Sequence, residues 1–189
     1  EMTETMKDRA KRLEAYTTPE WAIRAILDKE ILTQHVFDPC AGTGIMSRIL
    51  EEYGYDTEEY DIYPWKENMP IDDWLKPEAG IEFFELQNST IFMNPPFSKA
   101  CEFVEKGFDR GARKIVSFQR FTWYEGKSRR QFWENHPPSR IYVCGDRASC
   151  WRFDVEDKDK RNGTPTTHAW YVWERGHPAG TQLGHIYKK

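Results

Sequence analysis

The residues best suited to chemistry form one short loop, Asn94-Pro95-Pro96-Phe97, directly after an apolar run at 89–93. Such a run is typical of a buried strand, and the two prolines end it abruptly. The sequence therefore presents an amide, a rigid backbone turn and an aromatic ring at the carboxyl end of a strand, where open α/β sheets bind ligands. A strand-to-helix loop that merely contains two prolines is the structural alternative.

A second loop of small residues lies upstream, Asp38-Pro39-Cys40-Ala41-Gly42-Thr43-Gly44. It follows an apolar run at 35–37 and precedes a helical pattern at 45–50, so it occupies the strand-to-helix turn of a βαβ unit. Glycines there allow the backbone to approach a ligand closely, and the helix offers free N–H groups. The absence of a following G-K-[ST] sequence argues against a nucleoside triphosphate site.

The elements that must position these loops alternate between strands and helices along 189 residues, a length that suits one domain. The sequence predicts strands at 35–37, 57–60, 80–84, 89–93, 114–118, 140–144 and 168–173, the last of them aromatic and apolar enough to be central in the sheet. Residues 1–15 are expected to form a solvated helix or a partly disordered lead-in. Thr18 and Ser98 are expected to cap the helices that follow them.

An acidic residue ends the second predicted strand. Asp61 lies about twenty residues beyond the glycine turn, where a carboxylate can accept hydrogen bonds from both ribose hydroxyls of an adenosine, and Ile62 can form an apolar wall beside it. The alternative is a solvated acidic edge, since Glu58 and Glu59 are close by.

Together the two loops resemble S-adenosylmethionine-dependent amino-methyltransferases, in particular small phage- or prophage-type DNA adenine methyltransferases. Members carry a D-P-x-x-G-x-G cofactor loop after the first strand and an [NDS]-P-P-[FYW] catalytic loop after the fourth. A third motif, Tyr16-Thr17-Thr18-Pro19, looks like the Thr-Pro motif that precedes the cofactor loop in one subgroup and closes over the methionine end of the cofactor. The Pro137-Pro138-Ser139-Arg140 sequence and the 168–173 ending also resemble the small phage-type enzymes.

The resemblance implies a Rossmann-like class I methyltransferase fold of the α/β class, with a mixed, mostly parallel seven-stranded sheet flanked by helices. Residues 1–189 are expected to form a single catalytic domain without a separate target-recognition domain. Loops 120–135 and 145–167 are then the candidate DNA-contacting insertions, and short or relaxed sequence specificity is the hypothesis.

The resemblance also implies S-adenosylmethionine as the cofactor. Glu82 stands where the family commonly has an Asp that contacts the cofactor adenine, a departure from the pattern. The candidate cofactor-binding residues are Tyr16, Thr18, Pro19, Asp38, Pro39, Cys40, Ala41, Gly42, Thr43, Gly44, Asp61, Ile62, Glu82, Phe83 and Asn94.

The catalytic loop has a specific task in this family, because the exocyclic amino group of adenine is a poor nucleophile. Its lone pair is delocalised into the ring. If the Asn94 side-chain oxygen and the Pro95 carbonyl each accept one N–H, the nitrogen is drawn toward tetrahedral geometry and its lone pair points at the sulfonium methyl group. Pro96 helps to fix the loop, and Phe97 offers a face on which a base swung out of the duplex can stack.

The net charge of −4 is unevenly distributed along the chain. Residues 1–98 carry 9 Lys and Arg against 20 Asp and Glu, whereas residues 99–161 carry 15 against 10. The basic second half favours a local phosphate-binding surface, although an ordinary mixed surface is the alternative. The candidate DNA-binding residues are Arg120, Lys127, Arg129, Arg130, Arg147 and Arg152.

Other functions remain open at this stage. The same loop serves methyltransferases that act on RNA guanine or adenine or on a protein glutamine, and a non-catalytic cofactor- and DNA-binding subunit is a further alternative. The four cysteines lack metal or disulfide spacing, so we expect no metal and a reduced, cytoplasmic protein of a bacterium or phage-infected cell. We expect DNA as the partner, no membrane, and a monomer or weak dimer.

Overall fold

The strand that precedes the Asn94 loop, β3 (Ser89–Met93), is buried along its whole length. The computed structural model describes residues 3–77, 86–160 and 165–189. The other strands are β1 (His35–Asp38), β2 (Asp56–Glu59), β4 (Lys114–Arg120), β5 (Arg140–Cys144), β6 (His168–Glu174) and β7 (Gln182–Ile186). Over the described residues these seven strands form one mixed sheet in the order β2-β1-β3-β4-β6-β5-β7.

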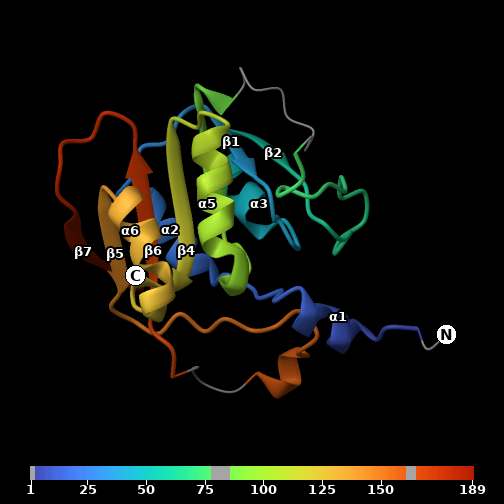
Figure 1. Ribbon diagram of the computed structural model, residues 1–189. Coiled ribbons are helices and arrows are strands. Elements are labelled where there is room, and N and C mark those ends of the chain that lie inside the picture. Colours follow the sequence, from blue (N-terminus) through green and yellow to red (C-terminus); the bar gives the residue numbers. More distant parts are fainter. Residues whose placement is uncertain (1–2, 78–85, 161–164) are drawn as a thin grey trace.

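Helices cover both faces of this sheet (Figure 1). One face is covered by α2 (Glu20–Leu27) and α3 (Ile45–Glu52), and the other by α5 (Ala100–Asp109) and α6 (Arg130–Asn135). The short helix α1 (Met6–Arg12) lies beyond one end of the sheet (Figure 1). Single 3₁₀ turns complete the described chain at η1 (Phe97–Lys99), η2 (Phe121–Tyr124), η3 (Lys127–Arg129) and η4 (Asp157–Asp159).

The core is divided into two layers by the alternation of side chains along each strand. Phe92 and Val116 pack with α2 and α3, whereas Ile91 and Ile115 pack with α5 and α6. Strands buried on both faces are rich in apolar residues, so they read as near-continuous hydrophobic runs. This is why β3 and β4 were predictable from composition.

The strand directions bring the candidate loops together. β1, β2, β3 and β4 are mutually parallel, while β6 runs antiparallel to both β4 and β5. The loops that follow β1, β2, β3 and β4 therefore all emerge at the same edge of the sheet, which is where such sheets bind ligands. The fold thus confirms the predicted α/β class with a mixed, mostly parallel sheet.

Two strand predictions were wrong in part, one about which strand comes last and the other about where a strand ends. The run at 168–173 is central, between β4 and β5, but it is not the last strand, because β7 pairs in parallel with β5. β7 is an edge strand with exposed residues along most of its length, so it lacks the apolar pattern of a buried strand. β4 also continues to Arg120, which is a strand residue rather than a loop residue. The predicted strand at 80–84 lies outside the described residues.

Both predicted helix caps were wrong. Pro19 occupies the N-cap position of α2, and Lys99 that of α5, without a side-chain cap at either. The Thr18 hydroxyl instead contacts Asn94, and the Ser98 hydroxyl donates to Glu14. Long-range contacts at the loop edge have thus replaced the local capping bonds that the sequence suggested.

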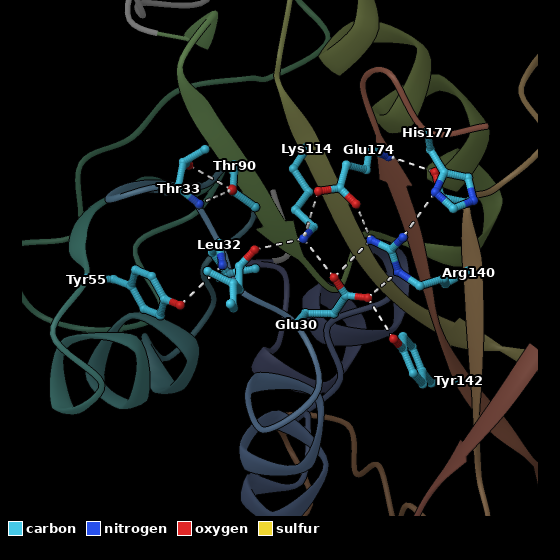
Figure 2. Close-up of polar contacts among 12 residues, drawn as sticks. Glu30, Leu32, Thr33, Tyr55, Thr90, Lys114, Arg140, Tyr142, Glu174 and His177 are labelled. Atoms are coloured by element: carbon cyan, nitrogen blue, oxygen red, sulfur yellow. Dashed lines mark hydrogen bonds and ion pairs between the residues drawn. The ribbon is translucent and has the colours of Figure 1, made fainter. Parts of the chain in front are cut away.

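A buried ion network stabilises the edge of the sheet opposite the one that carries the candidate loops (Figure 2). Glu30, just ahead of β1, binds Lys114 at 2.7 Å and Arg140 at 3.0 Å, the first residues of β4 and β5. The Tyr142 hydroxyl donates to Glu30, and Glu174 pairs with Lys114 and Arg140. Glu30 and Lys114 are only 4% and 5% exposed, so their charges depend on one another for compensation.

The described residues include four free cysteines. Cys40 and Cys101 are partly exposed free thiols, and Cys144 and Cys150 are buried ones. Within the described ranges, no cluster of three His, Cys, Asp or Glu side chains could hold a metal. No helix found there is both long and apolar enough to cross a membrane.

Candidate active site

A cleft of about 490 Å³ opens at the edge where the parallel strands end. This volume lies within the range of small-molecule sites. Eight of the residues predicted from sequence line it, and they come from four separate segments of the chain. They are Tyr16, Pro39, Cys40, Gly42, Asp61, Ile62, Asn94 and Pro96.

The glycine turn is tied to the end of β2 through Asp61. Gly42 and Gly44 both have left-handed φ angles, +57° and +81°, which glycine adopts without steric cost. The Gly42 N–H donates to Asp61 Oδ2 at 2.9 Å, and the Tyr63 N–H donates to Asp61 Oδ1 at 3.2 Å. Burial raises the pKa of Asp61 although these backbone N–H groups oppose the shift.

Asp38 shapes the start of the same turn and does not line the cleft. Its Oδ1 accepts the Cys40 N–H at 3.0 Å, which is an Asx-type turn that turns the chain away from β1. The carboxyl group is fully buried, and burial raises the pKa of Asp38 well above its ordinary value. Thr18, Pro19, Ala41, Thr43 and Gly44 likewise lie outside the lining of the cleft, and Glu82 and Phe83 lie outside the described residues.

Phe153 is a cleft residue that sequence reasoning missed. Its ring lies so close to Gly42 that a Cβ there would be 2.6 Å from Phe153 Cζ, and it meets Trp65 edge to face with centroids 5.0 Å apart. The segment is held by residues 15–17: the Thr17 N–H donates to the Trp151 carbonyl, and the Phe153 N–H donates to the Ala15 carbonyl. Part of the 145–167 loop therefore walls the cleft.

The N-terminal segment also contributes more than the sequence suggested. Residues 12–16 line the cleft, with Glu14 in a left-handed conformation at φ 49°. The Glu14 carboxylate accepts hydrogen bonds from both the N–H and the hydroxyl of Ser98. This contact fastens the N-terminal segment to the first turn after the Asn94 loop.

The Asn94 side chain is oriented by the Thr-Pro motif. Asn94 Nδ2 donates to Thr18 Oγ1 at 2.9 Å, and Thr18 is 3% exposed. An amide has separate donor and acceptor ends, so this bond leaves Asn94 Oδ1 as an acceptor. The neighbouring Pro95 carbonyl accepts a hydrogen bond from Gln119 Nε2 at 2.5 Å.

A second, smaller cavity of about 260 Å³ adjoins the cleft. The two share Glu14, Tyr16 and Asn94, so Asn94 stands at their junction. Pro95, Phe97, Gln119, Arg120 and His168 are among the residues that line the smaller cavity. Burial lowers the pKa of His168 to about 4, so its imidazole is neutral at pH 7.

The Phe97 ring faces two cations. The guanidinium carbon of Arg120 lies 5.1 Å from the ring centroid, and that of Arg129 lies 5.3 Å from it. Arg129 also donates to the carbonyls of Thr122, Trp123 and Glu125, so it holds the loop after β4 in place.

The other predicted DNA-binding cations lie at the surface or in ion pairs. Lys127 and Arg147 are exposed, and Arg130 is exposed beside Glu134. Arg152 pairs with Asp154 next to the N-terminal segment.

Comparison with known proteins places the fold. No protein-family model matches the sequence, and no curated protein matches it. Among solved structures, a type I restriction-modification methyltransferase subunit from Streptococcus thermophilus gives a TM-score of 0.60 at 10% identity, over 90% of this chain and 48% of that one. A candidate RNA methyltransferase from Pyrococcus horikoshii gives 0.56 at 17% identity, over 86% and 88% of the two chains. A candidate class I S-adenosylmethionine-dependent methyltransferase from Listeria monocytogenes gives 0.53 at 10%, over 88% and 62%.

The chain has the class I methyltransferase fold. Within this methyltransferase fold, the cleft lies at the carboxyl ends of β1 and β2, and the Asn94 loop borders it from β3. The site residues that sequence reasoning missed include Glu14, Trp65, Gln119, Phe153 and His168. Gln119 carried a weak signal, since it is a polar residue directly after the run at 115–118, in which only Ser117 is polar.

Proposed function

We propose that this protein transfers a methyl group from S-adenosylmethionine to the exocyclic amino group of adenine in DNA. The observation that carries the proposal is the orientation of Asn94. Its amide nitrogen is bound to Thr18, which leaves its oxygen as an acceptor, and Asn94 lines both the large cleft and the small cavity. A methyl donor in one cavity and an amino group in the other would meet beside that oxygen.

The large cleft fits the cofactor. Its volume suits a nucleoside-sized ligand, and its lining brings the Asp61 carboxylate, a hydrogen-bond acceptor, beside Gly42 of the glycine turn. Asp61 would accept the ribose hydroxyls, with Ile62 beside the adenine ring. When bound, the cofactor supplies a methyl group activated by attachment to a positively charged sulfur.

The residues of the Asn94 loop would prepare the attacking nitrogen. Asn94 Oδ1 and the Pro95 carbonyl each accept one N–H of the amino group, so the nitrogen lone pair is turned out of the base plane. That lone pair would form the new N–C bond as the C–S electron pair is left on sulfur, and the nitrogen would then release one proton to solvent. The products are the N-methylated base, S-adenosylhomocysteine and a proton.

The small cavity would hold the target base. At about 260 Å³ it is smaller than a typical drug-sized ligand site, as a single base requires. Phe97 offers an aromatic face within it. Since the adenine amino group is inaccessible to the loop inside a duplex, the base would have to leave the stack.

Nearby cations support a nucleic acid as the acceptor. Lys127 and Arg147 are exposed and available to phosphates, Arg130 is exposed but paired with Glu134, and Arg120 lies at the small cavity itself. Arg129 and Arg152 would act mainly by shaping the adjoining loops, because their guanidinium groups are engaged within the chain. The restriction-modification subunit among the structural neighbours adds support for DNA.

The acceptor class is tested by supplying methyl-labelled S-adenosylmethionine with one candidate acceptor at a time. Unmethylated duplex DNA, single-stranded DNA, structured RNA and glutamine-containing peptides form the panel. The proposal expects label in DNA. Label only in RNA or in a glutamine amide would assign the enzyme to that class, and label in none would favour a non-catalytic binding subunit.

Thr18→Val is expected to lower kcat about tenfold, because the isosteric side chain cannot accept the Asn94 amide hydrogen and the amide loses its fixed orientation. Affinity for the cofactor should change less. Steady-state kinetics together with calorimetric titration of the cofactor measures both. Thr18→Ser keeps the hydroxyl and should stay close to wild type. Equal kcat values for Thr18→Val and Thr18→Ser would contradict the assigned role.

Asp61→Asn is expected to weaken S-adenosylmethionine binding by about 10- to 100-fold, since a charged acceptor for the ribose hydroxyls is lost. The ionised carboxylate is the binding form. Because burial raises the pKa of Asp61, wild-type affinity should fall on acidification at a higher pH than for an ordinary aspartate. Calorimetric titration across pH measures this.

The Asp61→Asn protein should lack that acid limb. The exposed Asp56, at the start of the same strand, provides the matched control, and Asp56→Asn should bind the cofactor like wild type. An unchanged dissociation constant for Asp61→Asn would remove Asp61 from the cofactor site.

A further inference from the structure

Gln119 is a polar residue in a strand that is buried from Lys114 onward, two residues beyond the buried Ser117 on the same strand face. It is 4% exposed and lies near the end of β4, on the same strand face as Ile115, which packs in the apolar layer beneath α5. A buried amide costs free energy unless its polar atoms are paired. The contacts of Gln119 therefore indicate what holds it there.

Both ends of the Gln119 amide have partners. Nε2 donates to the Pro95 carbonyl at 2.5 Å, and Oε1 accepts the Arg120 N–H at 3.3 Å. The pairing fixes the amide orientation, since only the NH₂ end can donate to a carbonyl. Gln119 thus links the strand beside β3 to the loop that β3 carries.

The contact selects one of two acceptor positions on Pro95. A carbonyl oxygen has two lone pairs, so the bond from Gln119 leaves one of them for another donor. Pro95 and Gln119 both line the small cavity, where the proposed function places the amino group. Asn94, the other proposed acceptor, has a corresponding support in Thr18.

We propose that Gln119 is a positioning residue for methyl transfer, whose amide fixes the Pro95 carbonyl so that its second lone pair faces the amino group in the small cavity. This inference rests on the proposed function. It goes further by naming the residue that orients each acceptor. Thr18 orients the Asn94 amide, and Gln119 orients the Pro95 carbonyl. The opposite possibility is that Gln119 competes with the amino group for Pro95, and removal of the amide would then raise activity.

Two replacements test the assignment. Gln119→Met keeps the length of the side chain but removes the donor, and it should lower kcat about tenfold at every pH. Gln119→Glu has nearly the same shape, but its carboxyl group can donate to Pro95 only when protonated. Its kcat, relative to wild type, should therefore rise as the pH falls.

The measurement is kcat across pH on the acceptor that wild type methylates, with the cofactor dissociation constant and the melting temperature of each protein. Wild type corrects for the other charged or titratable groups that line the cavity, which are Glu14, Tyr16, Arg120, Cys150 and His168. The exposed Gln34 gives the matched control, and Gln34→Met should behave like wild type. A merely structural role would lower the melting temperature of Gln119→Glu without the acid-side recovery of kcat.

The outcomes separate the two proposals. Wild-type turnover with unchanged or raised kcat in Gln119→Met overturns the positioning role and leaves the proposed function standing. If Gln119→Met does not fold, a flat ratio of Gln119→Glu to wild-type kcat across pH overturns the role by itself. No methyl transfer by wild type to any acceptor overturns both.

Discussion

Asn94→Ala is expected to lower kcat by about 100- to 1,000-fold, the usual cost of removing one preorganised polar group from an active site. The amide oxygen is one of the two acceptors that would turn the amino nitrogen toward the methyl group, and alanine leaves nothing in its place. Cofactor affinity should fall far less, because Asn94 is one of many cleft residues. Single-turnover kinetics and calorimetric titration measure the two effects separately.

Asn88→Ala is the matched control for this change. Asn88 is an exposed residue just ahead of β3, at the opposite end of the strand from Asn94. Asn94→Asp keeps an acceptor beside the Thr18 hydroxyl and should retain more activity than Asn94→Ala. A turnover number for Asn94→Ala equal to that of the Asn88→Ala control would eliminate Asn94 from the chemistry.

Glu30→Gln is expected to cost about 3 to 5 kcal/mol of unfolding free energy, as is typical when one partner is removed from a buried ion pair. The change leaves Lys114 and Arg140 without their buried counter-charge at the edge of the sheet remote from the cleft (Figure 2). Urea unfolding at neutral pH measures it. Glu20→Gln, in an exposed pair with Arg24, should cost less than about 1 kcal/mol.

The contribution of Glu30 to the unfolding free energy also depends on pH. Burial tends to raise the pKa of Glu30, but hydrogen bonds from Arg140, Lys114 and Tyr142 outweigh burial and hold that pKa below its ordinary value of 4.5. The contribution is therefore complete above pH 4.5 and lost as the pH falls through the lowered pKa of the folded protein. Glu30→Gln should lack this acid loss, and replacing Glu30 and Lys114 together by apolar residues should recover part of the stability.

The sequence predicted the central sheet well because its strands are buried on both faces. β3 and β4 are buried along nearly their whole length, and each contains an apolar run that is visible in the sequence, at 91–93 and 115–116. Gly54 follows α3 with a left-handed φ of +88°, as a C-terminal glycine should. β7 escaped prediction because an edge strand pairs through its backbone and needs no apolar pattern.

The contacts that orient the site residues were much harder to predict from the sequence than the motifs themselves. The Thr18 contact with Asn94 joins residues 76 positions apart, and the Gln119 contact with Pro95 joins residues 24 apart. Glu14 reaches Ser98 across 84 positions. Such contacts depend on the tertiary fold, and local preferences at Thr18 and Ser98 pointed instead to helix caps.

The most direct test of the account locates the transferred methyl group on the acceptor. Purified protein is incubated with methyl-deuterated S-adenosylmethionine and unmethylated duplex DNA, and the DNA is digested for nucleoside mass spectrometry. The account predicts deuterated N6-methyladenine that disappears with Asn94→Ala. Label on cytosine, or on no nucleoside of DNA, would contradict it.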